Sequence, residues 1–208
     1  ILCVSVTSFS KDISSVNAFR NIEVIYIPKS RIKELKLDAS LSKLRKIIIG
    51  DSNLRQLPNV SGFKSLKELT VFGTEIGNVD TVHNLENLEE LSLVRNKNMR
   101  KVINLRNLPN LKQLELENSP LDIFETSTLP SLEELKLSKT NINNLINFEK
   151  YPSLRRLIIN DTKITSLKGI EKAPMLHSVQ ADYDVKNDPE NEKILRSLRQ
   201  NIFKRKPQ

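Results

Sequence analysis

A 22-residue repeat runs through this chain and limits what it can fold into. The stretch 132–153 has leucine at its first, fourth and sixth positions, and the stretch that begins at Leu154 repeats that apolar spacing. Because one such unit cannot bury its apolar face alone, copies at a fixed period stack into one body with a shared core. The repeats begin, at intervals of 21 to 23 residues, at Ile22, Leu44, Leu66, Leu88, Leu111, Leu132, Leu154 and Leu176.

The opening positions of each repeat alternate between buried-type and exposed-type residues. Leu69 and Val71 are apolar, whereas Glu68 and Thr70 beside them are polar. A period of two predicts a short β-strand with one buried face. Equivalent strands lie side by side, so they form a parallel sheet, and the rest of each repeat must carry the chain around to the next strand.

Every repeat has a small polar residue eight positions after its start, where the strand ends. Side chains of this kind hydrogen-bond nearby backbone groups that have lost their partners in the sheet. We therefore predict a column of turn-locking residues, made up of Ser30, Ser52, Thr74, Asn96, Ser119, Thr140, Thr162 and Asp184.

The remainder of each repeat has apolar residues at steps of about three, which favour 3₁₀ or single helical turns over long helices. Pro109, Pro130, Pro152 and Pro174 interrupt this return arm where a helix could not continue. An apolar column lies three residues before each repeat start, and its last four members, at positions 108, 129, 151 and 173, directly precede these prolines. The column consists of Phe19, Leu41, Phe63, Leu85, Leu108, Leu129, Tyr151 and Ala173.

The N-terminal residues 1–21 are predicted to be a degenerate repeat or cap, because Val4 and Val6 alternate as in a strand. The alternative interpretation is that residues 1–6 are the apolar tail of a secretory signal. The eight clear repeats then give a solenoid over residues 22–187.

The C-terminal segment 188–208 is predicted to be a capping helix followed by a basic tail. Asp188 suits an N-cap and Pro189 suits the first turn. A helix over 189–204 would gather Ile194, Leu195, Leu198, Ile202 and Phe203 on one face. The last coil of a stack exposes an apolar layer, so we expect this face to cover it. A membrane-surface or calmodulin-type role for this basic helix is the alternative.

Composition narrows the functional class. Cys3 is the only cysteine, which excludes an intrachain disulfide and favours an intracellular or bacterial secreted protein over a disulfide-rich eukaryotic extracellular one. No run reaches the roughly 18 apolar residues needed to cross a bilayer. His83 and His177 lie in different repeats without a metal-binding or nucleophilic arrangement. We therefore expect no catalysis and no cofactor.

The repeat pattern, Leu-x-x-Leu-x-Leu-x-x-(Asn/Thr/Ser)-x-Ile-x-x-Leu, resembles the leucine-rich repeat family over residues 19–185. Its 22-residue period is similar to that of bacterial internalins and of the regulatory leucine-rich-repeat subunit of protein phosphatase 1. The C-terminal segment departs from the cap of the phosphatase regulator, so no binding residue is carried over. The resemblance implies an α/β repeat solenoid: a curved stack of about eight coils with a parallel sheet on the concave face, which would hold a protein ligand.

The outward strand positions, two, four and six residues after each start, supply the candidate site. Tyr26, Ile48, Phe72 and Val94 are apolar there, and neighbouring strands would bring them together as an interaction surface. The other candidates are Glu68, Glu90, Glu115, Glu117, Glu134, Lys136, Arg156 and Ile158. Including Lys46 and Asp182, these positions hold six acids and three bases. Nucleic acid prefers a basic face, so it is an unlikely partner despite the net charge of +8.

The sequence thus predicts a non-enzymatic protein–protein interaction scaffold that binds its partner on the concave sheet face. The alternative is a leucine-rich repeat segment of a larger receptor or secreted pathogen effector, used for targeting or recognition. The partner's identity and the oligomeric state stay open.

Overall fold

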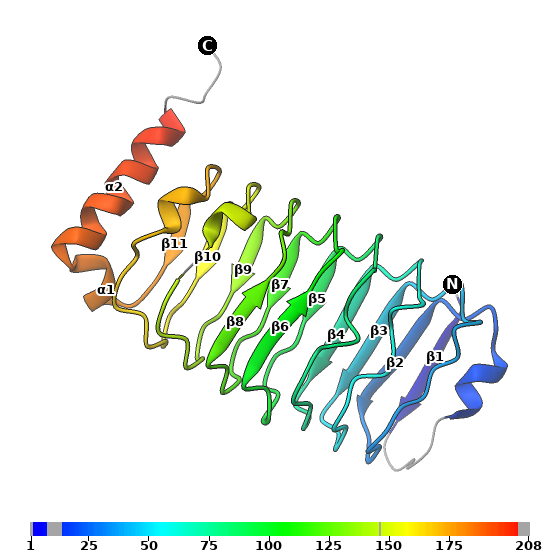
Figure 1. The fold of residues 1–208 in the computed structure, drawn as a ribbon. Coiled ribbons are helices and arrows are strands. Elements are labelled where there is room, and N and C mark those ends of the chain that lie inside the picture. The colour runs from blue at the N-terminus through cyan, green and yellow to red at the C-terminus, as the bar shows by residue number, and fades with distance from the viewer. Residues whose placement is uncertain (1, 8–13, 146, 204–208) are drawn as a thin grey trace.

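The structure, a computed structural model, describes residues 2–7, 14–145 and 147–203. Its coils are stacked side by side, and each contributes one strand to a nine-stranded parallel sheet (Figure 1). This confirms the predicted solenoid. In order along the sheet the strands are β1 (Cys3–Thr7), β2 (Val24–Lys29), β3 (Lys46–Gly50), β4 (Glu68–Phe72), β5 (Glu90–Ser92), β7 (Gln113–Glu115), β9 (Glu134–Lys136), β10 (Arg156–Ile158) and β11 (Ser178–Gln180).

The core consists of equivalent apolar residues that lie against each other from coil to coil. All eight predicted repeat starts are at most 2% exposed. Inside the sheet, Ile47 pairs with Leu69 and Leu69 pairs with Leu91, so the register follows the 22-residue period. Each fully buried side chain of this size contributes roughly 1.5–3 kcal/mol, and the stack is stable because these contributions are shared between coils.

The return arms are partly as predicted. Short 3₁₀ turns occur at η1 (Ser14–Ala18), η2 (Phe148–Lys150) and η3 (Ile170–Lys172). However, β6 (Lys101–Leu105) and β8 (Ile123–Thr126) pair as a second, two-stranded parallel sheet on the side opposite the main sheet (Figure 1). The predicted short 3₁₀ and irregular arms are therefore joined in two coils by an unpredicted strand pair, because adjacent arms of similar shape come close enough to share backbone hydrogen bonds.

The N-terminal segment contains a strand. Residues of β1 pair in parallel with β2, with Cys3 opposite Val24 and Ser5 opposite Tyr26. Phe19 was predicted to join the apolar return-arm column but is 49% exposed, because it belongs to the first coil and no earlier coil covers it among the described residues. Val6 lies in β1, but its side chain is outside the described part of the chain.

The predicted turn column is buried in six coils and half-buried at Thr162. Most of its hydroxyls bond within their own coil: Thr140 Oγ1 donates to the Leu137 carbonyl at 2.7 Å, and Thr162 Oγ1 donates to the Ile159 carbonyl at 2.9 Å. Asp184 was wrongly placed in this column. It is exposed in helix α1 (Tyr183–Asn187), because the chain turns into a helix after β11 instead of forming another coil.

A second column, one residue earlier, has left-handed backbone conformation in coil after coil. Its φ values are 64° at Gly73, 58° at Arg95 and 57° at Lys139, with Asp51, Asn118 and Asp161 alike. This bend lets each N–H continue the sheet ladder beyond the strand; the Arg95 N–H, for example, donates to the Glu117 carbonyl at 3.0 Å. In the last coil the Asp182 carboxylate replaces the carbonyl and accepts the Asp161 N–H at 3.0 Å.

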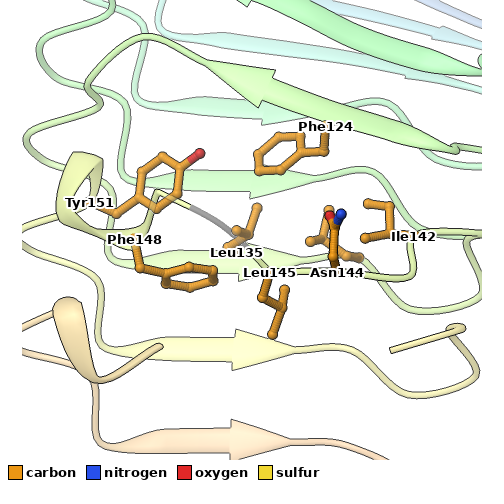
Figure 2. A pocket seen from close by; sticks show the side chains of 8 residues that line it. Phe124, Leu135, Ile142, Asn144, Leu145, Phe148 and Tyr151 are labelled. Atoms are coloured by element: carbon orange, nitrogen blue, oxygen red, sulfur yellow. The ribbon is translucent and has the colours of Figure 1, made fainter. Parts of the chain in front are cut away.

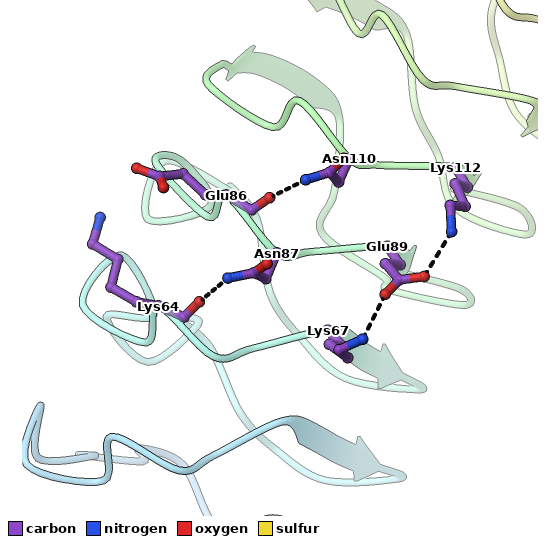
Figure 3. A network of polar contacts seen from close by, with 7 residues as sticks. All are labelled: Lys64, Lys67, Glu86, Asn87, Glu89, Asn110 and Lys112. Atoms are coloured by element: carbon purple, nitrogen blue, oxygen red, sulfur yellow. Dashed lines mark hydrogen bonds and ion pairs between the residues drawn. The ribbon is translucent and has the colours of Figure 1, made fainter.

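Side chains also tie the coils together at the opposite, N-terminal edge of the strands (Figure 3). Asn87 Nδ2 donates to the Lys64 carbonyl at 2.8 Å, and Asn110 Nδ2 donates to the Glu86 carbonyl at 2.7 Å. These bonds satisfy carbonyls that the return arm leaves without helical or sheet partners.

Two helices end the stack. After α1, the long helix α2 (Pro189–Phe203) begins at the predicted proline and lies at the β11 end of the solenoid (Figure 1). Asp188 Oδ1 accepts the N–H groups of Glu190 and Asn191 at 3.0 Å each, which is the predicted N-cap. Leu198 is buried, whereas residue 204 and the side chains of Ile202 and Phe203 lie outside the described residues. The division at residues 21 and 187 stays a prediction.

Candidate functional site

The outward side of the nine-stranded sheet, here called the strand face, holds the predicted site residues. The register places the candidates in straight columns across the strands: Lys46 opposite Glu68, Glu68 opposite Glu90, and Glu115 opposite Lys136. A residue and its counterpart one repeat later are therefore direct neighbours.

The apolar patch, which consists of Tyr26, Ile48, Phe72 and Val94, lies towards the N-terminal end of this face. Tyr26 and Ile48 pair directly across β2 and β3. Tyr26 is 39% exposed and the other three are half-buried. Val94 occupies the coil after Phe72, where its carbonyl accepts the Gly73 N–H at 3.0 Å.

Phe72 is held in place by two neighbours that sequence reasoning missed. Its ring lies across Gly50, so closely that a Cβ added there would collide with Phe72 Cζ. On the ring, the Arg95 guanidinium carbon lies 5.5 Å from the centroid, and Arg95 also reaches Asp51 at 3.5 Å. The sequence could have indicated the contact between Phe72 and Gly50. Gly50 lies one repeat before Phe72 and pairs with it in the sheet, and only glycine leaves room there for the ring.

Ile158 does not join the apolar patch. It lies on β10 opposite Lys136 and Gln180, and β4, β5, β7 and β9 separate it from Ile48 on β3. It is a half-buried apolar residue among polar neighbours.

Three of the six predicted acids, Glu68, Glu115 and Glu134, form ion pairs with bases on adjacent strands. Lys46 forms an ion pair with Glu68, and Arg156 Nη1 lies 3.1 Å from Glu134. Ser92 Oγ donates to Glu115 at 3.0 Å. Two acids, Glu90 and Glu117, have no hydrogen bond or ion pair from their side chains within the described residues. The strand face is therefore less acidic in effect than its composition indicates.

Lys136 is the electrostatic centre of the strand face. Its ammonium lies 2.5 Å from Glu115 and 3.8 Å from Glu134. Partial burial acts to lower the pKa of Lys136, but the hydrogen bond to Glu115 and the charges of Glu134 and Glu117 outweigh it and raise the pKa above its ordinary value. Lys136 thus holds the carboxylates of Glu115 on β7 and Glu134 on β9 close together.

Glu89 occupies a similar position at the N-terminal edge of the strands, between two lysines (Figure 3). Lys112 Nζ lies 2.8 Å and Lys67 Nζ 2.9 Å from its carboxylate oxygens. The Lys112 hydrogen bond, followed by that of Lys67, lowers the pKa of Glu89 from 4.5 to about 2.

We expect the Glu89 carboxyl to titrate near pH 2 in an NMR pH titration of its side-chain carbons. Because the folded pKa lies below the unfolded value, its stabilising effect is complete above pH 4.5 and is lost as the pH falls from 4.5 towards 2. Lys112→Met should raise this midpoint. Lys64→Met should not, since the Lys64 ammonium bonds the Asn84 carbonyl instead. A wild-type midpoint near 4.5 would contradict the prediction.

A small cavity lies between β9 and the return arms that carry Phe124, Phe148 and Tyr151 (Figure 2). The Phe124 and Tyr151 rings stack with centroids 6.4 Å apart, and Phe148 meets Tyr151 edge-on at 5.7 Å. The cavity measures about 20 Å³, enough for one water molecule. Burial raises the pKa of Tyr151, whose hydroxyl lies 2.9 Å from Thr126 Oγ1. This space is a gap in core packing and not a ligand site.

Within the described ranges, no three His, Cys, Asp or Glu side chains gather in a way that could hold a metal ion. No helix in the same part of the chain has the length and apolar character to cross a bilayer.

No protein-family model matches this chain, and neither does any curated protein. Several solved structures share its fold. Internalin C2 of Listeria monocytogenes superposes with a TM-score of 0.61 at 19% identity, covering 87% of this chain and 78% of that one. The leucine-rich repeat domain of APL1B gives 0.55 at 15% identity, covering 83% and 61%. The ectodomain of the Arabidopsis thaliana receptor kinase GASSHO1/SCHENGEN3, in complex with CASPARIAN STRIP INTEGRITY FACTOR 2, gives 0.51 at 13%, covering 84% and 26%.

Proposed function

We propose that this chain, which has the leucine-rich-repeat fold, is a non-enzymatic scaffold that holds a protein partner on its strand face, with the apolar patch as the main anchor. The observation that carries the proposal is the support of Phe72, whose ring rests on Gly50 and lies beside Arg95. An apolar side chain fixed in advance loses little conformational entropy on binding.

The composition of the patch also favours protein recognition. Interface residues that contribute most to affinity are enriched in aromatic residues and arginine. Tyr26 on β2, Phe72 on β4 and Arg95 just after β5 supply these types. The fold neighbours include a receptor ectodomain in complex with CASPARIAN STRIP INTEGRITY FACTOR 2, which supports a binding role by analogy only.

Affinity capture with the wild-type chain, followed by titration of each captured protein, tests the proposal. Phe72→Ala should weaken binding by about tenfold or more, and Tyr26→Ala should also weaken it. Tyr26→Ala is included because the Phe72 variant could misfold, whereas Tyr26 is 39% exposed and its truncation should leave the fold intact. The matched control is Ile123→Ala, which removes an apolar side chain that is 48% exposed on β8, in the opposite sheet. Unchanged affinity in both patch variants would refute the anchor.

Charge on the strand face is tested separately with Glu90→Lys. Glu90 is exposed and has no ion pair among the described residues, so the substitution changes the surface charge without breaking an internal contact. Its effect should fall mainly on the association rate and diminish with added salt. A nucleic-acid partner would instead bind more tightly to Glu90→Lys and lose affinity steeply with salt.

The second candidate, a recognition segment of a larger receptor or secreted effector, would use the same strand face. The chain spans 61% of the APL1B domain and 26% of the receptor ectodomain, and it resembles an internalin in fold. The lone Cys3 supports an intracellular or bacterially secreted setting. Sequencing the full reading frame discriminates, because an attached anchoring or signalling domain would favour this candidate.

A further inference from the structure

A groove of about 250 Å³ opens at the N-terminal ends of β7, β9, β10 and β11. Its two arginines are distant from Ile48 of the apolar patch, because β3 and β10 are five strand spacings apart, or about 24 Å. The side chains that line it are Lys112, Gln113, Glu133, Glu134, Arg155, Arg156 and His177.

Hydrogen-bond donors outnumber acceptors in this groove. Arg155 makes one loose contact, 3.8 Å from Glu133, and Arg156 gives one hydrogen bond of 3.1 Å to Glu134. Each guanidinium carries five N–H groups, so most of these donors have no protein acceptor. Both arginines are more than half exposed, at 51% and 53% of the side chain, and His177 is exposed beside them.

The two glutamates that line the groove contact neighbouring bases to different degrees. Glu134 is only 16% exposed and lies between Arg156 and Lys136. Glu133 is half exposed and weakly held. Lys112 is bonded to Glu89 and adds positive potential without being free. An incoming anion would therefore meet two incompletely used guanidinium groups.

We infer that this groove receives a single carboxylate, an Asp or Glu side chain of the protein partner, bound by Arg155 and Arg156. This inference rests on the proposed scaffold function. Guanidinium groups match carboxylates in geometry and can bind both oxygens at once. A partner segment in extended conformation needs about seven or eight residues to reach from the groove to Ile48, at roughly 3.3 Å per residue.

A polyanion fits the groove less well. Glu89, Glu133 and Glu134 lie in or beside it, so a nucleic-acid backbone with closely spaced phosphates would meet acids as often as bases. A single carboxylate needs only the N–H groups of Arg155 and Arg156 that Glu133 and Glu134 leave unused.

The test uses the full chain and two small probes, acetyl-Gly-Glu-Gly-amide and its Gln counterpart, followed by ¹H–¹⁵N NMR shifts. The Glu probe should shift the amides of Gln113, Arg155, Arg156 and His177 with a Kd of order millimolar, and the Gln probe should not. Arg155→Gln should weaken the Glu probe about fivefold or more. Because Arg155 is only loosely paired, this variant should fold normally. Arg156→Gln is the second variant.

The matched control is Arg45→Gln, since Arg45 stands one residue after its repeat start just as Arg155 does, but directly before β3. It should leave the shifts unchanged. The inference is overturned if the Gln probe gives equal shifts, if Arg45→Gln weakens binding as much as Arg155→Gln, or if inorganic phosphate shifts the same amides at tenfold lower concentration. Phe72→Ala should not affect the probe, so the groove and the apolar patch can fail independently.

Discussion

Asn96→Ala is expected to lower the free energy of unfolding by about 3 kcal/mol. Asn96 is fully buried and is the one turn-column residue whose side chain bonds the preceding coil at two places. Its Oδ1 accepts the Thr74 N–H at 3.2 Å and the Thr74 hydroxyl at 2.7 Å, and its Nδ2 donates to the Val71 carbonyl at 2.9 Å. Alanine leaves a buried N–H and a buried carbonyl without partners, each costing about 1–3 kcal/mol.

Asn96→Ser separates the two bonds. Ser119, at the equivalent place in the next coil, accepts the Asn96 N–H at 3.1 Å, so a serine can replace the acceptor function but cannot reach the Val71 carbonyl. We expect it to cost about half as much as alanine. Lys97→Ala, on the exposed neighbour, is the control and should change stability by less than about 0.5 kcal/mol. Urea denaturation followed by circular dichroism measures all three, and equal stability of Asn96→Ala and the control would contradict the assignment.

The 22-residue period predicts the strands of the main sheet, but it does not predict the side-chain hydrogen bonds between neighbouring coils. In the main sheet, the strands from β2 to β11 lie where the apolar spacing predicts, because burial on one face leaves no freedom in register, whereas β6 and β8 of the second sheet were not predicted. The turn column was also predictable from its small polar side chains. The hydrogen-bond partners of these side chains were not predictable. Thr140 bonds its own coil, whereas Asn96 bonds the coil before it, and only the three-dimensional spacing decides between the two.

The left-handed column was missed because its residue types are mixed. Gly73 and Asn118 favour positive φ, but Arg95 and Lys139 adopt it at a cost of roughly 1–2 kcal/mol each. No shared residue type therefore marks these positions in the sequence. The repeat geometry imposes it, since the N–H must point to the next coil where the strand ends.

The charged residues of the strand face were predicted, but the ion pairs between them were not. Counting acids suggested an acidic strip, whereas the register pairs Lys46 with Glu68 and Glu134 with Arg156. These partners are 22 residues apart, so the period itself contained the pairing. Lys136 likewise lies opposite Glu115, whereas its second contact, with Glu134 on the same strand, depends on a side-chain conformation that no periodicity specifies.

Asn191→Ala is expected to release helix α2 from the end of the stack. Asn191 is 1% exposed and connects three backbone groups: its Oδ1 accepts the Leu167 N–H at 2.8 Å, and its Nδ2 donates to the carbonyls of Thr165 and Val185 at 2.8 and 2.9 Å. Alanine favours a helix more than asparagine does, so any loss must come from docking and not from helix propensity. We expect a destabilisation of about 2–4 kcal/mol.

Hydrogen exchange distinguishes release of the cap from general unfolding. In Asn191→Ala the amides of α2 and of the last coil should lose protection, while those of β3 and β4 keep theirs, because each coil is stabilised mainly by its neighbours. Asn187→Ala is the matched control: Asn187 is exposed, and within the described residues its side chain bonds only the Tyr183 carbonyl of α1, at 2.9 Å. If α2 protection is unchanged in Asn191→Ala, or falls equally in Asn187→Ala, then contacts of Leu198 and its apolar neighbours hold the cap without this asparagine.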